Sequence, residues 1–194
     1  MLTAIINSMA KKATLLWLDL EMTGVDVESD VILEVAAIAT DWDFKEIATF
    51  EAVIQQDETF MRTQMAKAKN VWTGKNFWDE NPEARDGLFA QNKSGKQQSE
   101  VERAFISFID AQFNTDEPVY LAGNSIHNDR RFIYTYMPQL DAKLHYRMLD
   151  VTAWKLIFEN KFHKKFASPK SHRALDDIRR SIAELEYYLK KVKT

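Results

Sequence analysis

The sequence predicts an α/β protein built on a mixed five-stranded sheet flanked by helices, and two observations lead to that class. Three apolar runs joined by short turns fill the first part of the chain, which is typical of an antiparallel meander. They cover residues 13–20, 31–41 and 44–54. Two shorter apolar runs, at 118–122 and 145–151, then alternate with helical patterns, as parallel strands do.

The composition suits one domain covering residues 1–194, because 194 residues with a 45% apolar fraction can bury a sizeable core. Residues 1–12 are expected to form a loose tail. Within it, Met9 fits a translation start as well as Met1 does. The absence of cysteine excludes disulfides, zinc-thiolate sites and thiol catalysis, and it favours the cytoplasm. No apolar run approaches the ~20 residues that span a bilayer, so no membrane association is expected. The formal charge of -3 argues against a protein that coats long nucleic acid.

The first apolar run is unusual because Asp19 and Glu21 lie near its carboxyl end. Side chains alternate along a strand, so both carboxylates point to the same side. Two ionised carboxylates in a water-poor place repel each other, and a divalent metal ion would supply the missing positive charge. Thr23-Gly24 permits a turn directly after them. Taken alone, such a pair more often consists of one acid that caps a turn and one that is solvated.

Helical patterns fill most of the rest of the chain. An irregular helical region is expected over 57–91, with Pro82 in a first turn, and an amphipathic helix over 99–113. The aromatic residues of the first region, Trp78 among them, fit core packing on general grounds. The strand at 145–151 is expected to pass directly into a helix that runs through Phe158.

Asp129 follows the strand at 118–122 and begins a helix that Pro138 ends. The intervening Gly123-Asn124-Ser125 loop can bring its carboxylate to the sheet edge that carries Asp19. Because an aspartate at a helix start is also a good N-cap, the residue by itself leaves both roles open.

The final helix is expected over about 174–192, and His172 precedes it. Its apolar face places Asp177 closer to the protein interior than Asp176, so Asp177 could reach a buried site. A histidine at that position can act as a general base near neutral pH, or it can be an ordinary solvated side chain.

These residues together resemble a known family. Asp19-x-Glu21, Asp129 within Gly-Asn-Ser-Ile-x-x-Asp-Arg-Arg-Phe, and His172-x-x-x-x-Asp177 resemble the three exonuclease motifs of the DEDD superfamily, in its histidine-containing branch. The wider text, including Trp-Leu-Asp-Leu-Glu-Met-Thr-Gly and His-Tyr-Arg-x-Leu-Asp-Val, resembles the oligoribonuclease family within that branch. The likeness runs from about Leu16 to Tyr188.

The resemblance implies a ribonuclease H-like fold and a 3′-to-5′ exoribonuclease that shortens very short RNA to nucleoside 5′-monophosphates. It implies that Asp19, Glu21, Asp129 and Asp177 hold two Mg²⁺ or Mn²⁺ ions, hard cations that prefer oxygen ligands. It also implies that His172 takes a proton from the attacking water.

The resemblance further implies a homodimer whose partner subunit closes the site over the substrate. Tyr146 and Arg147 would come from that partner, because an aromatic ring stacks on a base and arginine forks onto a phosphate. Tyr146 could instead be ordinary strand packing, but the flanking His and Arg are poor core formers. The remaining substrate contacts implied by the resemblance are Val25 and Trp78 beside a base, Ser125 near a phosphate, and Thr152.

The chain departs from the family pattern upstream of Trp78. An insertion of about ten residues lies somewhere between Met61 and Phe77, and it leaves Trp72 as a rival for the role of Trp78. Glu83 and Asp86 stand where the family usually carries a histidine and Ser-Gly-Leu, and their negative charge would repel a phosphate. The substrate length is therefore open from the sequence.

Two other functions remain to be weighed. A DEDD exonuclease for longer RNA or for DNA 3′ ends would keep the same chemistry, but the acidic pI near 5.9 speaks against it. A catalytically inactive RNA-binding module would be expected to have lost one of the motif acids, and none is lost.

Overall fold

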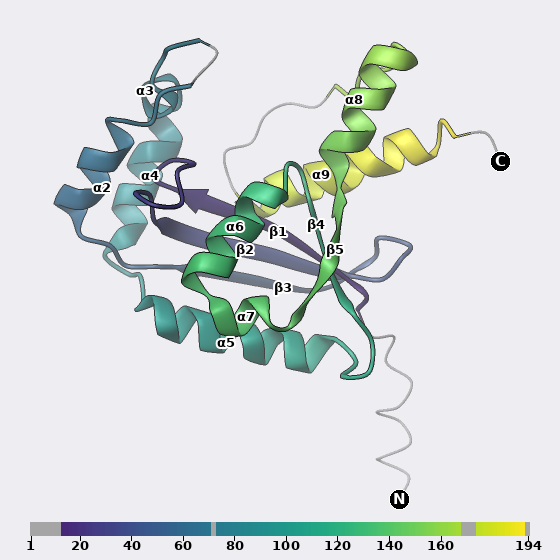
Figure 1. The fold of residues 1–194 in the computed structure, drawn as a ribbon, viewed down its shortest axis with the longest axis horizontal. Helices are drawn as coiled ribbons and strands as arrows, with labels where there is room; N and C mark the ends of the chain where they lie inside the picture. The colour runs from purple at the N-terminus through teal and green to yellow at the C-terminus, as the bar shows by residue number, and fades with distance from the viewer. Residues whose placement is uncertain (1–12, 71–72, 168–173, 193–194) are drawn as a thin grey trace, which may run out of the picture.

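A single mixed sheet organises the protein, and its strands lie in the order β3-β2-β1-β4-β5 (Figure 1). The computed structural model describes residues 13–70, 73–167 and 174–192. The strands are β1 (Leu15–Met22), β2 (Ile32–Thr40), β3 (Glu46–Val53), β4 (Val119–Gly123) and β5 (Leu144–Asp150). β1, β2 and β3 form an antiparallel meander, whereas β4 pairs in parallel with both β1 and β5. The predicted five-stranded mixed sheet is confirmed.

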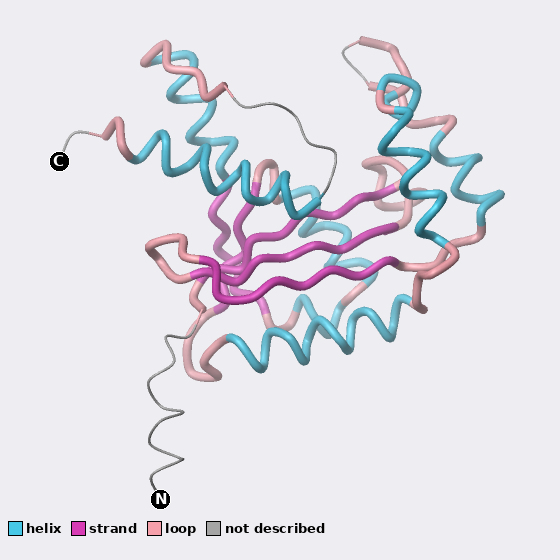
Figure 2. Tube along the Cα trace, turned by 180° about the vertical axis from the view of Figure 1, so that it is seen from behind, coloured by secondary structure: helices cyan, strands magenta, loops and turns pink. Residues whose placement is uncertain are grey.

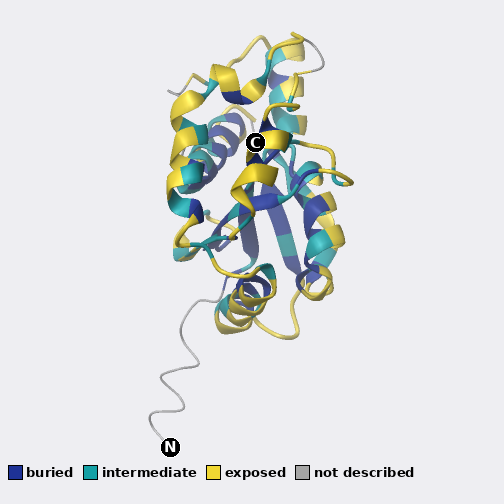
Figure 3. Cartoon of the chain, turned by 90° about the vertical axis from the view of Figure 1, so that its left-hand side faces the viewer, coloured by how far each residue is buried: buried dark blue, intermediate teal, exposed yellow. Residues whose placement is uncertain are grey.

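Helices cover both faces of this sheet. They are α2 (Glu58–Met65), α3 (Phe77–Glu80), α4 (Pro82–Asn92), α5 (Gln98–Gln112), α6 (His127–Tyr136), α7 (Pro138–Asp141), α8 (Val151–Lys161) and α9 (Ala174–Leu189). In Figure 2, α5 runs along one face of the sheet and α9 along the other. The inner strands β1, β2 and β4 are largely buried, and dark blue strands lie between the helices in Figure 3.

The alternation of β1 explains how one strand serves both layers. Leu16, Leu18 and Leu20 belong to the core cluster that contains Phe105 and Ile109 of α5. The intervening Leu15 and Trp17 belong to the second cluster, together with Ala174 and Ile178 of α9. Side chains with odd numbers on β1 therefore face α9, and this assigns a side to the two acids further along the strand.

The irregular helical region after β3 forms a small third cluster at one end of the sheet. α2, α3 and α4 bury Met61, Met65, Trp78 and Leu88 against Leu33 of β2. Pro82 is the first residue of α4, as predicted, where its missing N–H costs no helical hydrogen bond.

Two boundaries differ from the sequence prediction in ways that affect the site. β1 continues to Met22 rather than ending at Leu20, because its pairing with β2 extends past Glu21 before a register shift. α6 begins at His127, so Asp129 lies inside the first turn and is not the N-cap. No helix among the described residues is both long and apolar enough to cross a membrane.

Candidate active site

Asp19 and Glu21 lie at the carboxyl end of β1, on the side of the sheet that α9 covers. They continue the odd-numbered row begun by Leu15 and Trp17, whose side chains pack under α9. Both acids are half-buried. Leu18, which precedes Asp19, and Leu20, which lies between the two acids, face the core on the α5 side of the sheet. The alternation of an ordinary buried strand therefore points two carboxylates into the same layer.

Asp129 reaches the same strand from α6. Its side chain is 7% exposed, and its Oδ1 accepts a hydrogen bond from the Leu20 N–H at 3.0 Å. This N–H is available because the pairing of β1 with β4 ends at Trp17 and Ala122, so β1 runs on beyond its neighbour. The backbone between the two β1 acids thus anchors a third carboxylate.

Asp177 approaches from the first turn of α9. Its side chain is 18% exposed and lies 3.0 Å from Nη2 of Arg180, whereas the side chain of Asp176 is 51% exposed. Ala174 and Ile178 on either side of Asp177 pack in the cluster that also holds Trp17. The expectation that Asp177 is the more buried of the two aspartates is confirmed.

Electrostatics show that these acids share one environment. Burial, followed by repulsion from Asp129, Glu21, Asp177 and Glu34, raises the pKa of Asp19 well above its usual range. Burial, with repulsion from Glu34, Asp177 and Asp129, raises the pKa of Glu21 to about 7. Burial also raises the pKa of Asp129 to about 7, although the Leu20 N–H works in the opposite direction. A cation at this place would relieve all three penalties.

Glu34 is a fifth acid that the sequence analysis missed. It lies opposite Glu21 in the β1–β2 register, and its Oε2 accepts a hydrogen bond of 2.6 Å from Gln91 of α4. A signal was present in the sequence, because Glu34 is the single acid in the otherwise largely apolar stretch that forms β2. Only the strand register shows that this acid faces Glu21.

The donor set fits hard divalent cations. Every side chain gathered here offers carboxylate oxygen, the ligand that Mg²⁺ and Mn²⁺ prefer. Within residues 13–70, 73–167 and 174–192, no three acidic or histidine side chains form a ready-made metal cluster. His172, expected to act as the base, lies outside the described residues.

Hydrogen bonds fix the turn after β1, which carries Val25. This residue is 69% exposed. The Asp30 carboxylate accepts hydrogen bonds from the Thr23 hydroxyl at 2.7 Å and from the Asp26 N–H at 2.9 Å. A Cβ on Gly24 would lie 2.4 Å from this carboxylate, so only glycine fits there. The Tyr136 hydroxyl lies 2.9 Å from two carbonyl oxygens of the same turn.

Trp78 does not offer a ring face to a base in this structure. It is 3% exposed, it packs in the cluster of Leu33 and Met61, and its indole Nε1 donates to the Thr23 carbonyl at 2.8 Å. The physical reason is that the helices α2, α3 and α4 pack together and enclose the indole. The core-packing alternative describes the observed ring, and its rival Trp72 lies outside the described residues.

Ser125 and Thr152 meet at the carboxyl ends of β4 and β5. The Ser125 N–H donates to Thr152 Oγ1 at 2.8 Å and to Asp150 Oδ1 at 3.0 Å, and the two hydroxyls lie 3.1 Å apart. Ser125 has a φ of 49°, a left-handed conformation that these bonds stabilise. Asn124 next to it donates to Ser181 of α9, which ties this loop to the helix that carries Asp177.

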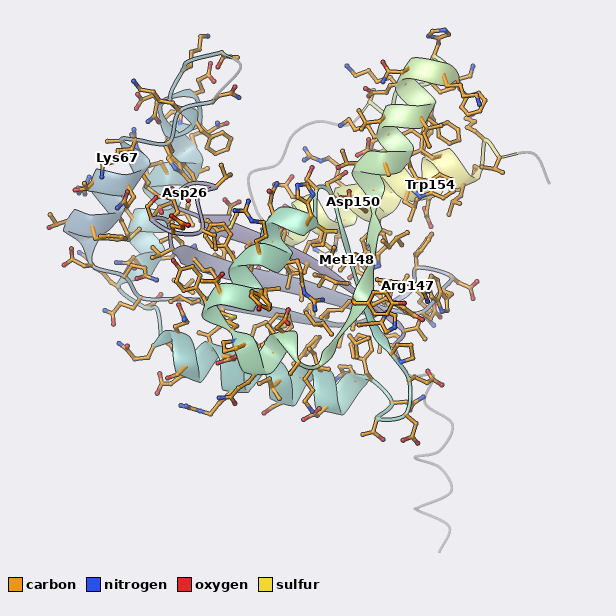
Figure 4. All side chains as sticks on the ribbon, in the orientation of Figure 1. Asp26, Lys67, Arg147, Met148, Asp150 and Trp154 are labelled. Carbon is orange, nitrogen blue, oxygen red and sulfur yellow. The ribbon has the colours of Figure 1, made fainter. Side chains whose placement is uncertain are left out.

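Tyr146 and Arg147 lie on β5, away from the acids of their own chain. Met148 is level with Leu121, which is level with Leu16, so Arg147 stands about four residues short of Asp19 and two strands away. At ~3.3 Å per residue, four residues alone correspond to about 13 Å. Figure 4 shows Arg147 on the edge strand, well apart from Asp26 in the turn after β1.

Comparison with known proteins places the chain in a family. The RNase T family model, described as "Exonuclease", matches residues 16–77 and 89–185. The oligoribonuclease of Francisella tularensis subsp. tularensis (strain WY96-3418) is 42% identical over 184 residues, covering 92% of this chain and 95% of that protein. The oligoribonuclease of Ectopseudomonas mendocina (strain ymp) is 37% identical over 180 residues, covering 90% and 93%.

Solved structures agree on the fold. Exonuclease I from Methylocaldum szegediense superposes with a TM-score of 0.62 at 13% identity, and the metal-free E. coli ExoI-ssDNA complex with 0.60 at 13%. These cover 92% and 93% of this chain, but the chain spans only 41% and 40% of theirs. The sheet is therefore ribonuclease H-like, as the resemblance implied. From its sequence relatives, the chain belongs to the oligoribonuclease family of hydrolytic 3′-to-5′ exoribonucleases.

Proposed function

We propose that this protein removes nucleotides one at a time from the 3′ end of RNA fragments of about two to five nucleotides, releasing nucleoside 5′-monophosphates with two bound Mg²⁺ or Mn²⁺ ions. The observation that carries the proposal is the gathering of Asp19, Glu21 and Asp129 in one buried place. Burial raises the pKa of all three carboxyl groups, so a nearby cation would stabilise their charged forms. A cluster of carboxylates at a strand end, where bound cations would be stabilised, suits phosphodiester hydrolysis.

The four motif acids have distinct positions and one shared role. Asp19 and Glu21 hold the metal ions from the strand, Asp129 from α6 and Asp177 from α9. When bound, the ions stabilise negative charge on the attacking and leaving oxygens. Arg180, now 3.0 Å from Asp177, would release that carboxylate to the metal. His172 accepts the proton of the attacking water.

The proposal assigns the other substrate contacts to residues of the turn after β1 and of the loops that follow β4 and β5. Val25 presents an apolar surface to a base from the turn after β1, and Trp78 holds that turn through its bond to the Thr23 carbonyl rather than by stacking. Ser125 and Thr152 offer paired hydroxyls to a phosphate. Each of these assignments rests on position and chemistry together.

A second copy of the chain completes the site. Tyr146 is 71% exposed on β5, an edge strand, and the neighbouring α8 exposes Leu156 and Ile157. Exposed apolar side chains beside an open sheet edge suit burial against another protein surface. In a homodimer, Tyr146 and Arg147 then cap the substrate in the partner's site. This arrangement agrees with the register, which keeps both residues away from the acids of their own chain.

The structure also suits one exonuclease domain, since all three core clusters border the same sheet. We place the enzyme in the cytoplasm, where short RNA fragments arise, in keeping with a sequence without cysteine.

A time course with 5′-labelled RNAs of two, five and fifteen nucleotides tests the proposal, with Mg²⁺, Mn²⁺ or a chelator. Rapid metal-dependent loss of the dinucleotide, with little attack on the longest RNA, is expected from a capped pocket. Preference for the fifteen-nucleotide RNA, or for a DNA of the same length tested beside it, would reject the cap and favour the alternative, a DEDD exonuclease for longer RNA or for DNA 3′ ends.

A further inference from the structure

His145 touches both cap residues at once. Its Nδ1 accepts a hydrogen bond from the backbone N–H of Arg147 at 3.1 Å. Its ring lies against the ring of Tyr146, with centroids 4.4 Å apart and an interplanar angle of 33°. The Arg147 guanidinium in turn lies 5.1 Å from the centroid of the Tyr146 ring. The His145 imidazole therefore contacts the ring of Tyr146 and fixes the backbone of Arg147.

Residues of β4 and α6 hold His145 in place. The ring of Tyr120 on β4 meets the imidazole edge-on, with centroids 4.9 Å apart, and Trp42 meets Tyr120 at 6.0 Å. The His145 carbonyl accepts a hydrogen bond of 3.1 Å from Nη1 of Arg130, whose Nε lies 2.6 Å from the Asp141 carboxylate. His145 is thus anchored to β4 through its ring and to α6 through its backbone carbonyl.

Such support matters because the cap residues are exposed. Tyr146 and Arg147 protrude from an edge strand, and a free side chain there samples several rotamers whose loss opposes binding. Contacts that hold a group in its bound orientation reduce this cost. His145 supplies two such contacts, a hydrogen bond and a ring contact, and each can be removed separately.

We infer that His145 is a positioning residue for substrate affinity, which orients Tyr146 and Arg147 toward the substrate in the partner's site. The inference rests on the proposed function, since it requires that these two residues act as a cap. The imidazole carries its proton on Nε2, leaving Nδ1 to accept from the Arg147 N–H. His145 itself does not touch the reacting atoms.

Two complementary variants separate the two contacts. His145→Phe keeps an aromatic ring beside Tyr146 but lacks the acceptor for the Arg147 N–H. His145→Asn keeps an acceptor at the place of Nδ1 but lacks the ring. We expect each to raise KM for a diribonucleotide by about threefold to tenfold, the range of one lost hydrogen bond or aromatic contact. His145→Ala loses both contacts and is expected to raise KM by more than either, with kcat within about twofold of wild type.

The controls keep the inference separate from the proposed function. His163→Asn changes an exposed histidine in the segment after α8 and is expected to leave KM unchanged. Arg147→Ala, measured in parallel, reports whether the cap exists at all. Loss of affinity in Arg147→Ala with unchanged KM in all three His145 variants would overturn the inference and leave the proposed function standing. Unchanged KM in Arg147→Ala would overturn the cap itself.

Two further results would also contradict a positioning role. A fall in kcat equal to the rise in KM would show that His145 acts on the chemistry. Dissociation of the dimer in light scattering, at the protein concentration of the assay, would show that it only supports assembly. The expected result is an intact dimer, an unchanged melting temperature and a defect confined to KM.

Discussion

The two regions proposed to act on the substrate differ in how much of their role is visible in a single chain. At the carboxyl end of β1, Asp129 is 7% exposed and shares a buried place with Asp19 and Glu21. On β5, Tyr146 is 71% exposed and faces solvent. Acids that are buried together are typical of a cation site, and this feature is visible in a single chain. An exposed aromatic and basic pair gains a function only when another surface meets it.

The largest expected effect comes from removing a buried acid. Asp177→Asn keeps the shape but removes the charge, and we expect turnover to fall by at least about a thousandfold because a metal ligand is lost. Asp176→Asn, one residue away on the exposed side of α9, is the matched control and should change turnover by less than twofold. Equal effects in the two variants, measured with a labelled dinucleotide in saturating Mg²⁺, would contradict the metal assignment.

The exposed region should respond differently. Arg147→Ala is expected to raise KM about tenfold, the cost of a lost charge-assisted hydrogen bond, without changing the melting temperature. Arg103→Ala, an exposed arginine on α5, should change neither value. A lower melting temperature in Arg147→Ala would show that the residue supports the fold rather than the substrate.

The buried acids also predict a pH dependence of stability in the absence of metal. A carboxyl group whose pKa is higher in the folded chain contributes stability below its unfolded pKa and loses it as pH rises through the folded value. For Glu21 and Asp129 that interval runs from about 4 to about 7. Thermal unfolding in a chelator should therefore show a free energy of unfolding that falls between these limits, by up to about 4 kcal/mol for each group, since one pKa unit corresponds to about 1.4 kcal/mol.

Added Mg²⁺ should restore most of that stability at pH 8 and little at pH 5, where the acids are protonated. The Asp19→Asn protein removes one repelling charge, so its stability in a chelator should depend less on pH than that of the wild type. A flat stability profile for the wild type would contradict the account of the buried acids.

The smallest effect concerns the turn after β1. Tyr136→Phe removes the hydroxyl that bonds the Val27 and Asp30 carbonyls, and we expect about 1 kcal/mol less stability and a twofold to fourfold higher KM. Tyr134→Phe, on the exposed face of the same helix, is the control and should be neutral. A loss of stability without any change in KM would show that this turn does not take part in binding.

The sequence predicts the buried region better than the exposed one, for physical reasons. Alternation along β1 was enough to place Asp19 and Glu21 on one side, and the periodicity of the last helix correctly separated Asp177 from Asp176. Glu34 was missed because its proximity to Glu21 depends on the register between two strands. Local pattern does not encode that register.

For Trp78 the sequence left both core packing and a contact with a base open. Trp78 lies in a region of three short helices, where periodicity is too brief to define an inward face. The structure encloses its ring among Met61, Leu33 and their neighbours. For Tyr146 and Arg147, family resemblance suggested the role, and the register supplied the physical reason to look for a partner.

The measurement that tests the central claim most directly is complementation between subunits. Asp19→Asn dimers lack one of the metal-binding acids in both sites, and Arg147→Ala dimers lack the arginine of the cap. After subunit exchange in an equal mixture, half of the dimers are mixed, and each holds one site with intact acids from one chain and an intact cap from the other.

At substrate concentrations well below KM, the account predicts that activity of the exchanged mixture rises to about a quarter of the wild-type value, since about one site in four is complete. Activity that stays at the diluted sum of the two separate variants, with exchange verified by differently tagged subunits, would contradict a site shared between two chains.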